Sequence, residues 1–122
     1  MMSLYKVKLE LARSKEAPNG DPSHGYVFVA PLDAAGHLDA ATWKAQRTRC
    51  TVERIVRHAV EERGHLVHVG QGWHFDYAQG TREDDQALYK LDRHVLKAGE
   101  YVSVTEHDGV LRTFKVASVA PA

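Results

Sequence analysis

Alternation of apolar and polar residues is the feature that most constrains how this chain can fold. The stretch LYKVKLELA at 4–12 places its apolar side chains on one face and its charged side chains on the other. The stretch GEYVSVTEHDGVLRTFKVASV at 99–119 repeats the pattern in two runs around Asp108-Gly109, a pair that suits a tight hairpin turn. A period of two is typical of half-buried strands, so both stretches predict antiparallel β-structure. The residues expected on the inner face of the second hairpin are Val102, Val104, Val110 or Leu111, Phe114 and Val116.

The middle of the chain predicts a loop, a strand, a short helix and one segment of undecided type. SKEAPNGDPSHG at 14–25 is rich in turn residues and predicts a long loop, whereas the apolar run YVFVAPL at 26–32 predicts a central strand. Asp39 can cap a short helix that docks Trp43 on the sheet. CTVERIVRHAVEERG at 50–64 has helical spacing but also a strand face and many β-branched residues, so helix and strand both stay open.

Together these segments predict a mainly β fold, α+β at most. We expect a small antiparallel β-barrel or curled β-sandwich built from hairpins, with one or two short helices, in a single domain over residues 1–122. Residues 78–99 predict a surface excursion with one short strand near 88–91. The stretches GYVFVAPLDAAGHLDA, GHLVHVGQGWHFDY and GEYVSVTEHDGVLRTFKV resemble those of small bacterial proteins that carry no assigned activity. The resemblance implies a compact bacterial domain and brings no site residues.

Charge and cysteine content narrow the class of protein. Sixteen basic and sixteen acidic side chains cancel, so no global field attracts nucleic acid or a membrane surface. The single cysteine, Cys50, excludes a disulfide within the chain and suits a reducing compartment. The N-terminus has no apolar run of signal-peptide length, and a cytoplasmic protein without a membrane partner is expected. Its partner would be a small molecule or a protein, and its state a monomer or homodimer.

The stretch HLVHVGQGWHFDY at 65–77 raises the possibility of a metal site. A three-residue loop at 70–72 would place His68 opposite His74 and separate polar from apolar residues, whereas a two-residue loop that pairs His68 with Phe75 mixes the faces. Directly opposed Cβ atoms lie about 5 Å apart, and Asp76 would add a carboxylate to the two imidazoles. Such a site could bind zinc or manganese and support hydrolysis. A solvated polar hairpin face accounts for the same residues without a metal and is favoured.

A binding or interaction module without catalysis is the leading functional hypothesis, because no catalytic group is assembled in the sequence. Trp73, Tyr77 and Arg54 are its candidate ligand-binding residues, placed on the hairpin at 65–77 and nearby. Nucleic-acid binding through the basic region 43–63 is a less favoured alternative, because glutamates interrupt its basic residues. It would need a shared face for Arg47, Arg49, Arg54 and Arg57, near the aromatic Trp43 and the ring of His58.

Three other groups have ordinary explanations. Cys50 is expected to be a small buried side chain rather than a nucleophile. The acidic stretch TREDD at 81–85 lacks the spacing of a calcium loop and predicts a solvated turn. Asp21, Ser23 and His24 lie too close together in the chain to converge as a triad, so a turn is expected there as well.

Overall fold

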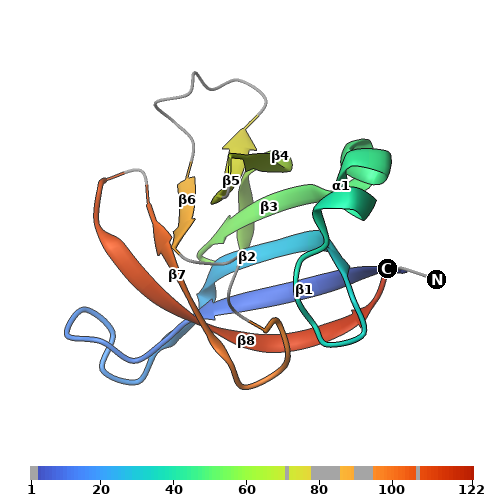
Figure 1. Ribbon diagram of the computed structural model, residues 1–122. Helices are drawn as coiled ribbons and strands as arrows, with labels where there is room; N and C mark the ends of the chain where they lie inside the picture. The colour runs from blue at the N-terminus through green and yellow to red at the C-terminus, as the bar shows by residue number, and fades with distance from the viewer. Residues whose placement is uncertain (1–2, 71, 78–85, 90–94, 107) are drawn as a thin grey trace.

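Eight antiparallel strands form a closed barrel in the part of the chain that the computed structural model describes, residues 3–70, 72–77, 86–89, 95–106 and 108–122 (Figure 1). Each strand pairs with the next along the chain, and β8 returns to pair with β1. The strands are β1 Ser3–Leu11, β2 Asp21–Leu32, β3 Thr51–Val56, β4 Ala59–Val69, β5 Gly72–Tyr77, β6 Gln86–Tyr89, β7 Tyr101–Thr105 and β8 Leu111–Pro121. The helix α1 spans Ala40–Gln46, and a 3-10 helix, η1, follows at Arg47–Arg49.

The predicted antiparallel fold is confirmed, with one correction in the C-terminal hairpin. β7 pairs with β8 across the turn that contains Gly109, whose φ of 81° is in the left-handed region that favours glycine. Phe114 and Val116 face the core as expected, but Val110 and Leu111 are exposed. Arg112 pairs with Val104 and takes the inner position instead. The alternation through Phe114 and Val116, extended to the start of the strand, places Arg112 inward and Leu111 outward.

The predicted loop at 14–25 is shorter than expected, because β2 already begins at Asp21. Asp21 pairs with Leu11 after a register shift in β1. Gly25 lies where the two backbones approach most closely: a Cβ there would lie 1.8 Å from the carbonyl oxygen of Leu9. Glycine is therefore required at this position, where a strand backbone approaches another closely.

Residues 50–64, whose type the sequence left open, form a β-hairpin. Arg57 and His58 make the turn between β3 and β4, both with positive φ, as the two central residues of a tight hairpin turn require. Arg54 pairs with Glu62 and Ile55 pairs with Val60, so Glu61 is an extra residue in β4. Such a bulge redirects side chains locally.

The short helix lies where the sequence predicted it. The Asp39 carboxylate accepts hydrogen bonds from the backbone N–H groups of Ala41 and Thr42 and so caps α1. The Trp43 indole N–H donates to the carbonyl oxygen of Leu66 in β4 at 2.7 Å. The expected docking of Trp43 on the barrel wall is thus confirmed.

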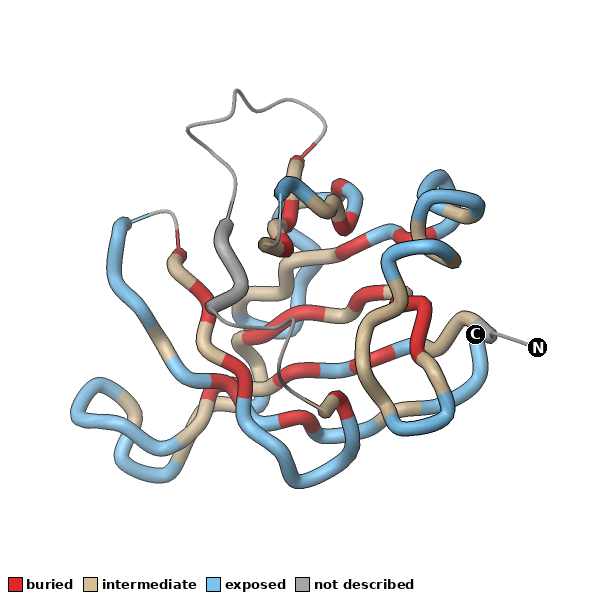
Figure 2. Tube along the Cα trace, viewed as in Figure 1, coloured by how far each residue is buried: buried red, intermediate tan, exposed pale blue. Residues whose placement is uncertain are grey.

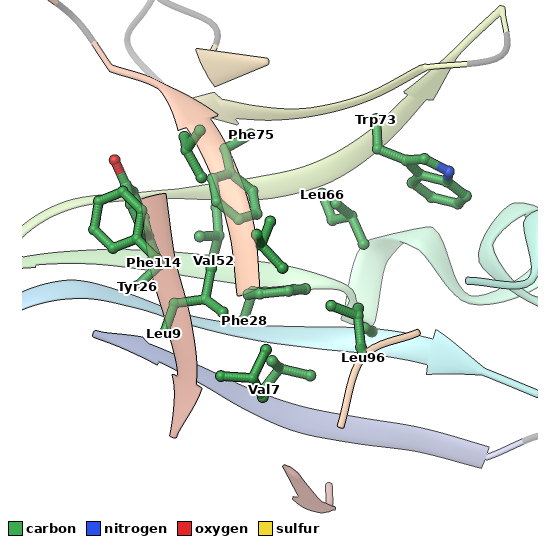
Figure 3. Close-up of a cluster of buried hydrophobic side chains, with 14 of the residues drawn as sticks. Val7, Leu9, Tyr26, Phe28, Val52, Leu66, Trp73, Phe75, Leu96 and Phe114 are labelled. Carbon is green, nitrogen blue, oxygen red and sulfur yellow. The ribbon is translucent and has the colours of Figure 1, made fainter. Parts of the chain in front are cut away.

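Alternate residues of the strands fill the barrel interior, and Figure 2 shows buried positions spaced along the strands. The rings of Tyr26, Phe28, Phe75 and Phe114 form the centre, with centroids 5.1 Å apart for Tyr26–Phe75 and Phe28–Phe75. In Figure 3 Tyr26 and Phe114 lie at one end of this cluster, and Trp73 and Leu96 lie at the other. The core therefore separates two ends of the barrel with different surroundings.

Residues 78–99 were predicted to contain one short strand. The strand expected near 88–91 is present as β6, four residues long, while 78–85 and 90–94, which include the acidic stretch at 81–85, lie outside the described residues. Within the described ranges, no helix has the length and apolar character needed to cross a membrane.

Candidate functional site

The inner face of the barrel changes from apolar to polar at the same end of several strands. Along β2 the inward residues run from Leu32 through Phe28 to Tyr26 and His24. The same alternation continues past Val104 of β7 to Glu106, and ahead of Phe114 in β8 to Arg112. We call this end the polar mouth. Its inner members are His24, Tyr26, Arg54, Tyr77, Glu106 and Arg112, and its outer acids are Glu16, Glu61 and Asp108.

Glu106 is the centre of the polar mouth. Its side chain is 2% exposed, and its Oε2 accepts a hydrogen bond from the Tyr26 hydroxyl at 2.6 Å and lies 2.9 Å from His24 Nε2. Arg112 Nη1 donates to Oε1 at 3.1 Å, and Arg54 Nη2 lies 3.7 Å from Oε2. A buried carboxylate without such partners would be strongly destabilising. The four partners hold it in one place.

The ionisation of this centre follows from its partners. Burial raises the pKa of Glu106, but the hydrogen bonds from His24 and Tyr26 and the charges of His24 and Arg54 outweigh burial, and the pKa lies below its ordinary value. Burial, and after it the adjacent Glu106 charge, raises the pKa of Tyr26. Glu106 is therefore an anion at neutral pH, and Tyr26 is a neutral phenol that donates to it.

Arg112 links this buried carboxylate to the surface. Its side chain is 16% exposed and donates from Nε and Nη2 to both oxygens of Glu16, at 2.8 and 3.1 Å. It also donates to both oxygens of Asp108, at 2.9 and 2.8 Å. The hydrogen bond from Arg112 and the backbone N–H of Val110 lower the pKa of Asp108 to about 2.

Arg54 occupies the corresponding place on β3. Its Nη1 lies 3.1 Å from Glu61, the extra residue of the β4 bulge, and its side chain is 13% exposed. The Nε atom of Arg54 is buried and has no hydrogen-bond partner among the residues that the structure describes. Burial raises the pKa of the neighbouring Tyr77, with a further contribution from Glu62, while Arg54 lowers it.

A cavity of about 460 Å³ opens above these groups, lined by the outer acids together with His24, Arg54, Glu106 and Arg112. This volume lies in the range of pockets that hold small molecules, and the mouth of a β-barrel is a common place for them. The lining combines two arginines with four carboxylates. The site therefore offers charged hydrogen-bonding groups rather than an apolar surface.

The predicted register of the 65–77 hairpin is wrong by one residue. His68 pairs with Trp73 and Val67 pairs with His74, rather than His68 with His74. Gly64 pairs with Tyr77, where the backbones are so close that a Cβ would lie 2.0 Å from the Asp76 carbonyl oxygen. Because a slip of one residue exchanges the two faces of a strand, this pairing turns Leu66 and His68 of β4 inward in place of Val67 and Val69, while Trp73, Phe75 and Tyr77 of β5 keep their predicted face.

The candidate metal ligands are consequently divided between two faces. His68 faces inward and stacks on Trp73 with ring centroids 4.3 Å apart, whereas His74 and Asp76 lie on the other face of β5. Across the described part of the chain, no three histidine, cysteine, aspartate or glutamate side chains are grouped to hold a metal ion. The arrangement of two histidines and one carboxylate that motivated a zinc or manganese site is not formed by His68, His74 and Asp76.

The three candidate ligand-binding residues are also separated. Arg54 and Tyr77 meet in the polar mouth, but Trp73 lies at the opposite end of the barrel with Trp43 and His68. We call this group of three rings the aromatic end. Its members pack against one another, with Trp43 and Trp73 centroids 6.0 Å apart.

One of the four arginines proposed for nucleic-acid binding lies away from the outer surface. Arg54 points into the polar mouth, and Arg49 and Arg57 flank opposite ends of β3. Arg49 and Arg57 are exposed, whereas the side chain of Arg54 is 13% exposed. Arg63 pairs with Glu53 at 3.1 Å. Arg54 is therefore not on an outer face with Arg49 and Arg57.

The remaining sequence candidates behave as structural groups. The Ser23 hydroxyl donates to Asp21 Oδ1 at 2.6 Å, while His24 turns towards Glu106, so the three residues do not converge as a triad. Cys50 is fully buried, and burial raises the pKa of its thiol to about 11. It is therefore protonated at neutral pH and is not activated as a nucleophile.

Sequence reasoning missed the three outer acids and four of the six inner members of the polar mouth, which are His24, Tyr26, Glu106 and Arg112. One signal could have found these four. Each continues the inward alternation of a strand by a single step of two residues, as Glu106 follows Val104 and His24 precedes Tyr26. Several inward positions that turn polar together indicate the end of a barrel interior.

Comparison with known proteins gives no match, whether with family models, curated proteins or solved structures.

Proposed function

We propose that this protein is a non-enzymatic binding module that takes a small polar molecule into the polar mouth of its barrel. The observation that carries the proposal is the cavity of about 460 Å³ over the buried carboxylate of Glu106. Glu106 fixes His24 and Arg112 at the cavity wall, so a ligand meets groups that are already in position. Binding to preorganised groups costs less side-chain entropy than ordering them on arrival.

Binding is favoured over catalysis because the reactive groups are engaged or buried. Glu106 is surrounded by four polar contacts, and the Cys50 thiol is buried with a raised pKa. His68, His74 and Asp76 do not come together as a metal site, and Arg54, one of the four arginines proposed for nucleic-acid binding, is directed towards Glu106. A cytoplasmic location remains part of the proposal, since an unpaired Cys50 suits a reducing compartment.

The polar mouth is a better candidate than the hairpin edge that the sequence favoured. A second hollow, of about 350 Å³, lies on the outer wall beside α1, where Trp43, Arg47 and Asp76 contribute to its lining. Its lining contains no fully buried charged side chain, in contrast to Glu106. A buried charge with convergent partners is typical of a binding site, and it distinguishes the polar mouth from the hollow beside α1.

A fragment screen by NMR tests the proposal. A library of small neutral, cationic and anionic fragments would be added to ¹⁵N-labelled protein. Chemical-shift changes would be followed for the backbone amides of strands β1 to β8. We expect saturable shifts at Tyr26, Tyr77 and Arg112 for one class of fragments, and their loss in Glu106→Gln. The matched control is Glu53→Gln, which removes a carboxylate from the exposed pair with Arg63.

The results that would contradict the proposal are equally specific. Shifts confined to the hollow beside Trp43 would move the binding site to the outer wall. An absence of saturable shifts in the polar mouth for every fragment class would remove the proposed function altogether.

A further inference from the structure

We propose that the ligand of the polar mouth carries a carboxylate, which binds Arg112 in place of Glu16 and is supported by Arg54 in place of Glu61. This inference rests on the proposed function and names the chemical class of its ligand. Its basis is a difference in exposure between the two arginines and the outer acids of the polar mouth. The arginines are mostly buried and held from within, and the outer acids that cover them are half exposed.

The contact between Arg112 and Glu16 shows the geometry that a ligand would copy. Arg112 presents Nε and Nη2 to the two oxygens of one carboxylate, at 2.8 and 3.1 Å. This paired arrangement is the characteristic way in which a planar guanidinium recognises a carboxylate. Glu16 reaches it from the loop between β1 and β2, at a distance of 96 residues in the chain.

The outer acids are the members of the site that can be replaced by a ligand. The side chains of Glu16, Glu61 and Asp108 are 58, 53 and 51% exposed, so their charges become hydrated when they move away. A ligand carboxylate that takes the place of Glu16 restores both hydrogen bonds to Arg112. The exchange therefore replaces one pair by another of the same geometry, and the rest of the ligand adds its own contacts in the cavity.

A cationic ligand faces a larger obstacle. It would have to compete with Arg54 and Arg112 for Glu106, whose side chain is nearly fully buried. Separating a buried carboxylate from its cations leaves an uncompensated charge, which is strongly destabilising. An ammonium group could reach Glu16 or Asp108 without this penalty, but those carboxylates are exposed and would bind it weakly.

Arg54 extends the same chemistry across the cavity. Its Nη1 lies 3.1 Å from Glu61, a half-exposed residue on the bulge of β4. A second oxygen on the ligand would accept a hydrogen bond from Nη1 in place of Glu61 as Glu61 moves outward.

The sign of one substitution separates the two ligand classes. If the outer acids compete with the ligand for arginine, removing the charge of Glu16 strengthens carboxylate binding. If the outer acids themselves bind the ligand, the same change weakens binding. Glu16 is exposed, so Glu16→Gln is expected to leave the fold intact.

The experiment uses three probes with one aromatic body: benzoate, benzylammonium and benzyl alcohol. Affinity would be measured by NMR titration, with the Nε–H resonances of Arg112 and Arg54 as local reporters. We expect benzoate to bind most tightly, with about a two- to fivefold gain in Glu16→Gln, the fold-change equivalent of one exposed ion pair. Arg112→Lys, which keeps the charge and removes the fork, is expected to weaken benzoate binding by about tenfold. Arg63→Lys, on an exposed pair away from the site, is the matched control.

Each outcome decides between the two proposals. Benzylammonium or benzyl alcohol binding more tightly than benzoate in the polar mouth overturns the inference and leaves the proposed function intact. Weaker benzoate binding in Glu16→Gln overturns it as well, because Glu16 would then be a ligand contact. If none of the three probes and no fragment of the wider screen shifts the polar mouth, both proposals fail.

Discussion

The polar mouth and the aromatic end complete the same barrel interior by different means. At the aromatic end, Trp43, His68 and Trp73 fill the space with rings whose centroids lie 4.3 to 6.0 Å apart. At the polar mouth, Glu106 and its partners meet through hydrogen bonds and ion pairs. His68 and Trp73, like Glu106 and Arg112, lie at the ends of inward-facing rows of residues, and Trp43 is added from α1. The two ends differ in the chemistry of these side chains.

This difference accounts for the charged lining of the cavity above Glu106. Rings pack against one another with little space between them, because contact itself stabilises them. Charged side chains must keep their outer groups hydrated, as the half-exposed Glu16, Glu61 and Asp108 do, and this leaves room above Glu106. The charged groups that are difficult to bury thus line the cavity proposed for a ligand.

Truncation at the aromatic end is expected to have the largest effect on stability. Trp73→Ala removes a buried ring and should lower the free energy of unfolding by about 3–5 kcal/mol, as large-to-small changes in a core do. Urea denaturation measures this change, and the exposed Tyr101→Ala should cost less than about 1 kcal/mol. A loss below that level for Trp73 would show that its end of the barrel is loosely packed.

Neutralising the centre of the polar mouth should have the next largest effect. Glu106→Gln leaves Arg54 and Arg112 facing a neutral amide and should lower the free energy of unfolding by about 3 kcal/mol. The same substitution at Glu53, in an exposed pair, should change it by less than about 0.5 kcal/mol. Equal effects at the two positions would mean that burial of Glu106 does not distinguish it from a surface carboxylate.

Removing one hydroxyl tests a single bond of this network. Tyr26→Phe keeps the ring contacts with Phe75 and Phe114 but removes the donor to Glu106. Hydrogen bonds to charged groups contribute about 1.5–3 kcal/mol, and we expect a loss at the lower end of this range because three other partners remain. Chemical denaturation of the variant measures it. If the variant is as stable as the unmodified protein, the basic partners alone stabilise the charge of Glu106.

The smallest effect is expected from acid. The pKa of Glu106 in the fold lies below its ordinary value of 4.5, so the ionised carboxylate stabilises the fold above that pH. This contribution is lost as the pH falls through the lower folded pKa. Denaturation midpoints between pH 7 and 3 should therefore fall less in Glu106→Gln than in the unmodified protein, whereas Trp73→Ala should show the unmodified pH dependence. Identical pH profiles for all three proteins would contradict a charged polar mouth.

Local patterns predicted those elements whose two faces differ clearly. The strand at 4–12 and the hairpin at 99–119 alternate strictly, and Asp39 has the side chain that caps a helix. The segment 50–64 could not be assigned, because apolar residues at helical spacing also shared a strand face. Pairing with β2, which places Tyr26 beside Arg54, selected the strand.

The hairpin at 65–77 is the element whose strand register the side-chain pattern did not predict. In β4, aliphatic and histidine residues occur on both faces, so neither face of that strand is marked by polarity alone. Close contact between Gly64 and the backbone of β5 accompanies a register one residue away from the prediction. The metal site depended on the predicted register, and in the register that forms, His68 lies on a different face from His74 and Asp76.

By itself, the amino-acid sequence determined that the chain forms antiparallel strands joined by tight turns, because side-chain alternation and turn chemistry act over a few residues. Only the tertiary structure decided which polar residues form a site. Glu106 meets His24 across 82 residues and Arg112 meets Glu16 across 96, and these contacts exist because β8 closes on β1. Closure brings together the inward ends of distant strands, and no local pattern specifies which charges will then face one another across the barrel.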